Sequence, residues 1–150
     1  MRWGSGEADV ERLLAAGHLE RVQGAQADGG SWLDRATQAL AAARLVATAA
    51  PDSSIILAYD AARQACVALL AQQGLRPTTA GGHYVVEEAI RAQFGAGFRA
   101  FGGLRRRRNE LEYPLYPTEK ASADEAAETL DTASQIIDAA ARLLPSLEFF

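Results

Sequence analysis

Four consecutive arginines, Arg105–Arg108, and the asparagine that follows them form the segment of this sequence best suited to bind an anion. A guanidinium is planar and carries several N–H donors, so it can hold a phosphate through two parallel hydrogen bonds. The rest of the chain is acidic, and the whole chain has a formal net charge of −4. This balance argues against indiscriminate nucleic-acid binding but allows a local basic patch. Arg105, Arg108 and Asn109 are therefore the candidate anion-binding residues.

Helical geometry restricts how these arginines can be arranged. Successive residues of a helix are rotated by about 100°, so four in a row point in all directions and at least one faces the packed side. A buried guanidinium needs a partner. We expect the pairs Arg106–Glu110 and Arg108–Glu112, each four residues apart, and an orienting contact from Asp60 to Arg108. The alternative is a solvated, salt-bridged surface with a structural role only.

Tyr113 is the second candidate catalytic residue, beside Arg108. The two residues are five positions apart, which places them about 140° apart on a continuous helix. Pro114 disfavours helical geometry at the preceding residue, so we expect the helix to end at Tyr113. Arg108 and Tyr113 can therefore share a cleft only if the helix ends there or a second molecule contributes. Tyr113 could donate a hydrogen bond or stack on a base.

A histidine is the other candidate for a supporting role, alongside Asp60. His83 follows Gly81 and Gly82 at an expected helix start, where the helix dipole lowers the pKa of an imidazole and keeps it a neutral base. The alternative is a capping or loop histidine. Cys66 falls on an apolar stripe, so we expect an inert thiol in the core.

Helical spacing dominates the rest of the sequence. Apolar residues recur at three- and four-residue steps, and extended β-branched runs are scarce. The expected helices cover 7–16, 31–50, 53–73, 83–94, the segment through the arginines up to Pro114, and 120–144. The fold class is therefore all-α, a small bundle of four principal antiparallel helices with one or two short accessory helices. Residues 1–30 form an accessory segment with a short helix, and 31–150 form a single bundle domain.

Two helix starts carry capping signals. Ser31, with Asp34 three residues later, predicts a box-like cap for the second helix. Pro51 is expected to stop that helix, and Asp52 or Ser53 to cap the next one.

The composition excludes several classes of site. A single cysteine cannot form an internal disulfide framework, and two histidines supply a metal centre poorly, so we expect no metal and no cofactor. No apolar run approaches the roughly 18 to 20 residues that span a bilayer, and the first residues turn acidic before any apolar stretch. We therefore expect a soluble cytoplasmic domain without membrane contact.

The spacing around the arginines resembles the signature of the HEPN family. Arg108–Asn109, three further residues and the Tyr113–Pro114 break come just before the last helix of a small bundle. The segment Ala58–Ala65, followed by two leucines, is similar to the family's early core helix, and Gly82–Val86 resembles the start of its next helix. The resemblance spans roughly residues 35–145.

This resemblance implies a helical module of toxin–antitoxin or defence systems. Active members cut RNA without a metal, an arginine holding the scissile phosphate and a histidine performing acid–base chemistry at the position of Tyr113. The ordinary pKa is near 6.5 for histidine and near 10 for tyrosine. Lowering the pKa of a tyrosine by about three units requires roughly 4 kcal/mol of stabilisation of its phenolate. We therefore expect a module that binds RNA or a nucleotide, or docks a partner, without efficient cleavage.

The resemblance also implies partners. Family members usually form a homodimer in which the motif segments face each other, and a nucleotidyltransferase is a common companion protein. Isologous packing would bring the arginines of two copies together in a cleft that attracts an anion. Two alternatives stay open: an active metal-independent endoribonuclease with Tyr113 or His83 as the replacement acid or base, and a purely structural oligomerisation module.

Overall fold

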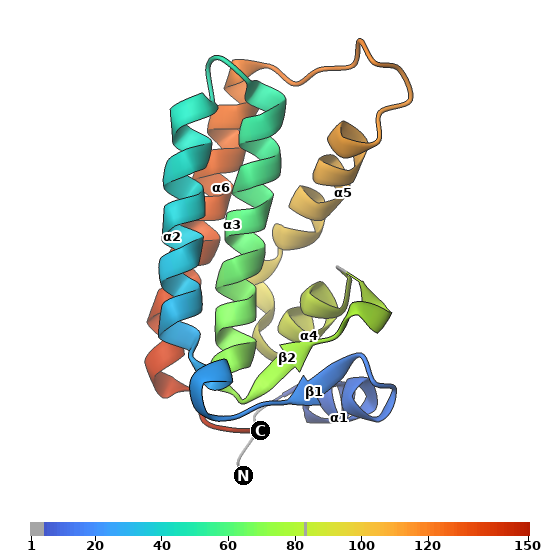
Figure 1. The fold of residues 1–150 in the computed structure, drawn as a ribbon, viewed down its shortest axis with the longest axis vertical. Helices are drawn as coiled ribbons and strands as arrows, with labels where there is room; N and C mark the ends of the chain where they lie inside the picture. Colours follow the sequence, from blue (N-terminus) through green and yellow to red (C-terminus); the bar gives the residue numbers. More distant parts are fainter. Residues whose placement is uncertain (1–4, 83) are drawn as a thin grey trace.

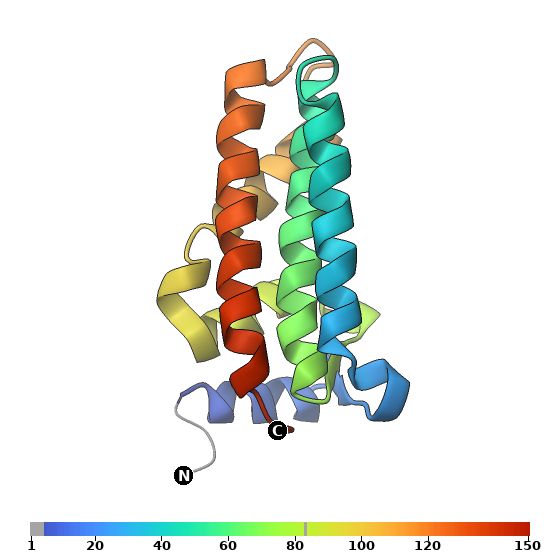
Figure 2. The ribbon, with the colours of Figure 1, turned by 90° about the vertical axis from the view of Figure 1, so that its left-hand side faces the viewer.

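Three long helices lie side by side and form the main body of the fold (Figures 1 and 2). They are α2 (Gly29–Val46), α3 (Pro51–Gln72) and α6 (Ala123–Leu143). The fourth principal helix, α5 (Phe101–Glu112), packs against α3 at its N-terminal end and leans away from it towards its C-terminal end (Figure 1). The structure is a computed structural model that describes residues 5–82 and 84–150. The predicted all-α bundle is confirmed.

Chain direction alternates between successive long helices, so α3 and α6, which are neighbours in space but not in sequence, run the same way (Figure 1). Two shorter helices, α1 (Glu7–Ala15) and α4 (Tyr84–Phe94), cover the lower end of the bundle in this view. They are the accessory helices of the fold.

A two-stranded antiparallel sheet at the same end was not predicted from the sequence. It joins β1 (Leu19–Arg21) to β2 (Leu75–Pro77). Each strand has only three residues, too few to show an alternating pattern. The pairing depends on a turn after α3, where Gly74 has a φ of 72° and its carbonyl accepts the Val22 N–H at 2.8 Å. Residues without glycine's freedom rarely adopt that φ.

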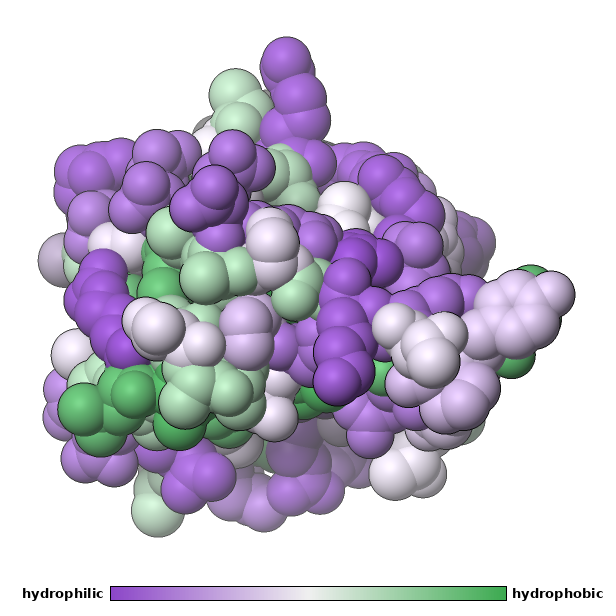
Figure 3. Space-filling model, turned by 90° about the horizontal axis from the view of Figure 1, so that it is seen from above, coloured by the Kyte–Doolittle hydropathy of each residue, from purple (hydrophilic) through white to green (hydrophobic). Residues whose placement is uncertain are grey.

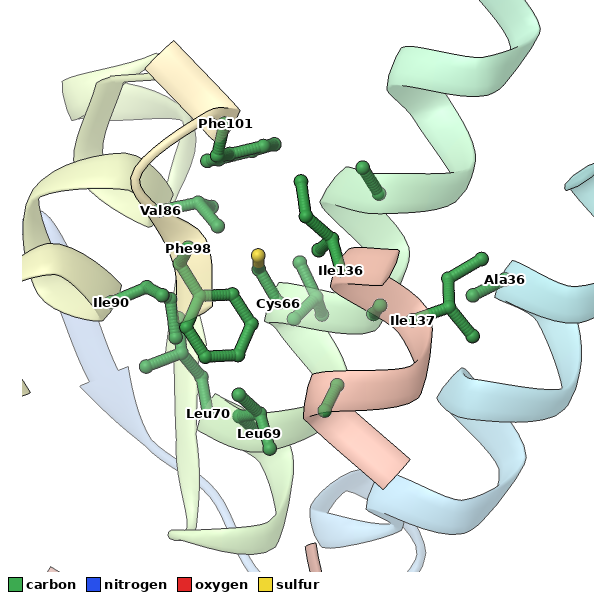
Figure 4. Packing of buried hydrophobic residues seen from close by; sticks show 14 of the residues in the cluster. Ala36, Cys66, Leu69, Leu70, Val86, Ile90, Phe98, Phe101, Ile136 and Ile137 are labelled. Carbon is green, nitrogen blue, oxygen red and sulfur yellow. The ribbon is translucent and has the colours of Figure 1, made fainter. Parts of the chain in front are cut away.

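Helix α3 is the centre of the core. It contacts α2, α6, α5 and α4, and most of its residues from Ala58 to Ala71 are buried. By length and composition α3 could cross a membrane, but 72% of its most apolar window is buried inside the protein, as expected of a core helix. Cys66 of α3 points into the cluster with Phe98 and Ile136 (Figure 4). Burial raises the pKa of the Cys66 thiol, in keeping with the expected inert core residue.

The N-terminal segment shares this core. Val10, Leu13 and Leu19 are buried within the same hydrophobic cluster as α3. Helix α1 packs against α4, and the Arg12 guanidinium lies 2.5 Å from the Glu88 carboxylate. The segment before residue 31 therefore contributes to the packing of the bundle.

Both predicted caps are wrong. Helix α2 begins two residues before Ser31, and the Asp28 carboxylate accepts the Ser31 N–H (3.0 Å) and hydroxyl (2.6 Å), so Ser31 is a donor in the first turn. Helix α3 begins at Pro51 itself, because the first position of a helix does not need the N–H that proline lacks. The Asp52 carboxylate instead accepts the N–H of Ala121 (2.7 Å) and ties α3 to the start of α6.

Candidate anion-binding site

The arginine run of α5 is divided among different surroundings, as helical rotation requires. Arg106 is exposed, Arg105 and Arg107 form ion pairs with neighbouring helices, and Arg108 is largely buried with 18% of its side chain exposed. One helix therefore holds both structural arginines and a candidate ligand-binding arginine.

Arg105 joins α5 to α4 through a buried carboxylate. Its Nε donates to Glu87 Oε2 at 2.6 Å, and Arg91 donates to the other oxygen at 2.7 Å. The Glu87 side chain is only 3% exposed, so this charge depends on its two partners. Gly102 makes room for it, because a Cβ there would lie 2.4 Å from Glu87 Oε1. The Arg105 guanidinium also lies 5.4 Å from the centre of the Tyr84 ring.

Arg107 joins α5 to the first turn of α6. Its Nε and Nη2 donate to the two oxygens of Glu125 at 2.5 and 3.1 Å, a two-bond geometry. These hydrogen bonds raise the pKa of the Arg107 guanidinium above its ordinary value. The predicted Arg106–Glu110 pair is wrong, since Glu110 instead lies 3.7 Å from Arg107. The structural alternative thus accounts for Arg105 and Arg107.

Arg108 has the weakest partners of the three half-buried arginines in α5. Its Nη2 lies 3.9 Å from Glu112, which confirms the predicted pair at a loose distance, and its Nη1 donates to Asn109 Oδ1 at 3.3 Å. Its Nε is buried and has no hydrogen-bond partner within residues 5–82 and 84–150. A buried donor left without a partner is costly.

Two neighbouring residues of α3 also have buried polar atoms that lack a hydrogen-bond partner within the described part of the chain. Arg63 Nε and Gln64 Oε1 are also buried without a partner among the described residues. Arg63 and Arg108 both act on the buried Tyr59 hydroxyl: burial raises the pKa of Tyr59 to about 12, and the two guanidiniums oppose that rise. Tyr59 itself stacks on Phe101 of α5, with ring centres 5.6 Å apart. Arg63 of α3 and Arg108 of α5 therefore both lie near enough to Tyr59 to act on it electrostatically.

Sequence reasoning missed Arg63 and Gln64. The signal that could have identified them is their position, since they are two polar residues between Ala62 and Ala65 in the most apolar helix of the chain. A long polar side chain inside a core helix needs a partner or a ligand.

Of the two predicted supporting residues, Asp60 and His83, the structure describes Asp60. Asp60 is half-buried on α3 and raises the pKa of the neighbouring Tyr59, so it belongs to the same electrostatic environment as Arg108. The carboxylate that pairs with Arg108 is that of Glu112. His83 lies outside the described residues.

Tyr113 follows the last residue of α5. Its N–H still donates to the Asn109 carbonyl at 3.0 Å, but its φ of −129° leaves the helical region, as Pro114 predicts. The Tyr113 side chain is 75% exposed, and Asn109 is exposed as well. Arg108 is turned inward, and Tyr113 stands in solvent beyond the helix end.

A pocket of about 270 Å³ lies away from these residues, where the end of α3 meets the C-terminal residues. It is lined by Arg21, Val22, Gln23, Gln73, Gly74, Phe149 and Phe150. Within the part of the chain that the structure describes, no three His, Cys, Asp or Glu side chains gather as metal ligands would.

A family model described as "HEPN domain" matches residues 30–143, which is more than half of the chain. The match covers α2 to α6 apart from Gly29, the first residue of α2. The chain therefore belongs to the HEPN domain family, and the resemblance drawn from the motif is confirmed at this level. Membership indicates an RNA-related or nuclease-like module. No curated protein and no solved structure matches the chain significantly.

Proposed function

We propose that this HEPN protein binds RNA, or a nucleotide, by holding a phosphate between Arg63 and Arg108. The observation that carries the proposal is the pair of buried Nε atoms on α3 and α5 that lack partners among the described residues. Phosphate oxygens are strong acceptors, and a hydrogen bond from a guanidinium to an anion is about twice as strong as a neutral one. A bound phosphate would supply the acceptors that both Nε atoms lack among the described residues.

The second part of the proposal is that binding is not followed by efficient cleavage. General acid–base catalysis works best with a group whose pKa lies near the working pH, which is why histidine serves so often. The position that carries histidine in active members is occupied here by a phenol, that of Tyr113, in a site open to solvent. Such a group suits contact with RNA better than proton transfer.

A homodimer is the third part of the proposal. Arg108 turns inward and Tyr113 outward within one molecule, so a second copy placed with its motif against the first would complete a cleft. The biological setting that the family suggests is a toxin–antitoxin or defence pair with a nucleotidyltransferase-type partner. Size-exclusion chromatography with light scattering should show twice the monomer mass at micromolar concentration, and a single monomer peak would contradict this part.

Fluorescence anisotropy with a labelled RNA oligonucleotide tests the phosphate site. We expect Arg108→Ala and Arg63→Ala each to weaken binding about tenfold or more, because each removes charge-assisted hydrogen bonds to the phosphate. Arg106→Ala is the matched control: it removes the same charge from the same helix, but from an exposed side chain, and should cost only about two- to threefold. Affinity should also fall steeply with salt.

Two results would contradict the proposal. RNA cleavage that resists a chelator and disappears in Arg108→Ala would make the protein an active endoribonuclease. Equal RNA affinity in Arg108→Ala, Arg63→Ala and Arg106→Ala, combined with a loss of thermal stability in the first two, would leave only the structural role.

A further inference from the structure

The loop after α5 exposes large side chains in an unusual concentration. Tyr113, Leu115 and Tyr116 are 75%, 83% and 63% exposed, whereas Tyr59, Leu69 and Leu70 of the central helix α3 are fully buried. In the view from above, the loop forms the lobe that projects at the right, with pale and green surface beside strongly hydrophilic neighbours (Figure 3). Exposed apolar groups gathered in one place mark an interaction site more often than single ones do.

This loop is held in a fixed shape although it lies outside the bundle. The Tyr116 N–H donates to Glu119 Oε1 at 3.2 Å, and the Glu119 N–H donates back to the Tyr116 carbonyl at 3.0 Å. Its far end is anchored by the bond from the Ala121 N–H to the Asp52 carboxylate. Pro114 and Pro117 further restrict the backbone. The aromatic rings are therefore presented on a preorganised loop, which lowers the entropy lost on binding.

The loop also continues directly from the proposed phosphate site. Tyr113 lies five residues after Arg108, about 7.5 Å further along the axis of α5. The exposed Arg106 lies on the same helix. The nearby carboxylates are engaged: Glu110 lies beside Arg107, Glu112 beside Arg108, and Glu119 holds the loop.

We infer that loop 113–118 is a stacking platform for unpaired bases, so that the ligand of the proposed phosphate site is single-stranded RNA. The inference rests on the proposed function and adds the class of ligand. Aromatic side chains beside a basic groove are the usual means of binding single strands, because every base has a face on which a ring can stack. Bases paired in a duplex cannot be stacked in this way.

A protein partner fits the loop less well. A stable protein interface buries about 800 Å² on each side, far more than one short loop offers. Leu115 is the single aliphatic side chain beside two tyrosines and two prolines. Exposed tyrosine rings that follow a run of arginines in the chain match the chemistry of a base and its phosphate.

The test compares a single-stranded RNA of about ten nucleotides with a duplex of the same sequence, by anisotropy on the full chain. We expect wild type to prefer the single strand, and Tyr116→Ala and Tyr113→Ala each to weaken single-strand binding about five- to tenfold. Tyr116→Phe should stay within twofold of wild type because the ring is retained. Phe149→Ala is the control, since Phe149 is 53% exposed at the C-terminal end of the chain. A 2-aminopurine in the strand should lose fluorescence on binding wild type but not Tyr116→Ala.

The outcomes separate the two claims. One outcome is that the protein binds single strand and duplex equally well, and that this binding is lost in Arg108→Ala but unchanged in the tyrosine variants. That outcome would overturn the stacking platform and support the phosphate site. Absence of binding to either RNA would overturn both. A homodimer that dissociates in Tyr116→Ala would identify the loop as a contact between copies, which also overturns the platform.

Discussion

At the scale of single residues, adjacent arginines in α5 have different surroundings and different partners. Arg105 and Arg107 are held by Glu87 and Glu125 and attach the helix to its neighbours. Arg108 has a loose contact with Glu112 and a hydrogen bond to Asn109, and it retains a buried donor without a partner among the described residues. Ordinary ion pairs thus account for two of the arginines, and the proposed phosphate site uses the third, Arg108.

Two neighbouring glycines in the first turn of α5 allow a matched test of this packing. Alanine normally favours a helix over glycine. At Gly102, however, the new Cβ would lie 2.4 Å from Glu87 Oε1, and moving that carboxylate would disturb its bonds to Arg91 and Arg105. Gly102→Ala should therefore lower the free energy of unfolding by about 1–2 kcal/mol, measured by urea denaturation.

The control for that substitution is Gly103→Ala. Gly103 is exposed, and the nearest atom to its Cβ position is Arg106 Nη2 at 3.8 Å. Its free energy of unfolding should stay the same or rise by a few tenths of a kcal/mol. Equal effects at both glycines would contradict the packing described around Glu87.

The buried Tyr59 predicts a dependence of stability on pH in the alkaline range. Burial raises its pKa to about 12 in the folded protein, whereas an unfolded tyrosine titrates near 10. Between these values the folded state holds a proton that the unfolded state releases, so stability falls as pH rises. The free energy of unfolding should drop by about 1 kcal/mol between pH 10 and 11 from this residue.

Comparing variants isolates that contribution. Tyr59→Phe should lose about 1 kcal/mol less than wild type over the same pH interval, in urea titrations at each pH. Tyr116→Phe, which changes an exposed ring, should keep the wild-type slope. A Tyr59→Phe slope equal to that of wild type would show that Tyr59 does not set this dependence.

At the scale of elements, helix ends depend on residues that a sequence pattern does not single out. Asp28 caps α2 by accepting the Ser31 N–H and hydroxyl. Asp28→Ala should therefore lower the free energy of unfolding by about 1 kcal/mol. Asp34→Ala removes an exposed carboxylate from the same helix and should change it by less than about 0.5 kcal/mol. The reverse order would support a cap formed by Ser31 and Asp34.

At the scale of the whole molecule, the N-terminal segment and the bundle share one hydrophobic cluster, so we expect them to unfold together. Leu13 of α1 is fully buried in that cluster. Leu13→Ala should lower the free energy of global unfolding by about 2–4 kcal/mol, since a cavity would remain. Leu45→Ala, at a side chain that is 86% exposed, should change it by less than about 0.5 kcal/mol. Two separate transitions in circular dichroism would show that the segment folds independently.

Much of the fold could be predicted from spacing alone, because amphipathic helices leave a local pattern. The end of α5 at Tyr113 followed from Pro114, and the burial of Cys66 from its position on an apolar stripe. The sheet of β1 and β2 could not be predicted, since its strands are short and its pairing joins segments more than 50 residues apart. The cap predictions were wrong for a related reason. Several nearby polar residues could cap each helix, and only the backbone geometry selects one of them.

The sequence by itself determined the helical class, the concentration of positive charge in α5 and the family, because these properties depend on residue type and local order. Only the tertiary structure decided which half-buried arginine of α5 has no close ion pair with another helix among the described residues. Glu87 and Glu125 come from other helices and neutralise Arg105 and Arg107, whereas Arg108 of α5 acts on the same buried Tyr59 as Arg63 of α3. The charge around a guanidinium is set by whatever packs against it, and such packing joins residues that are distant in the chain.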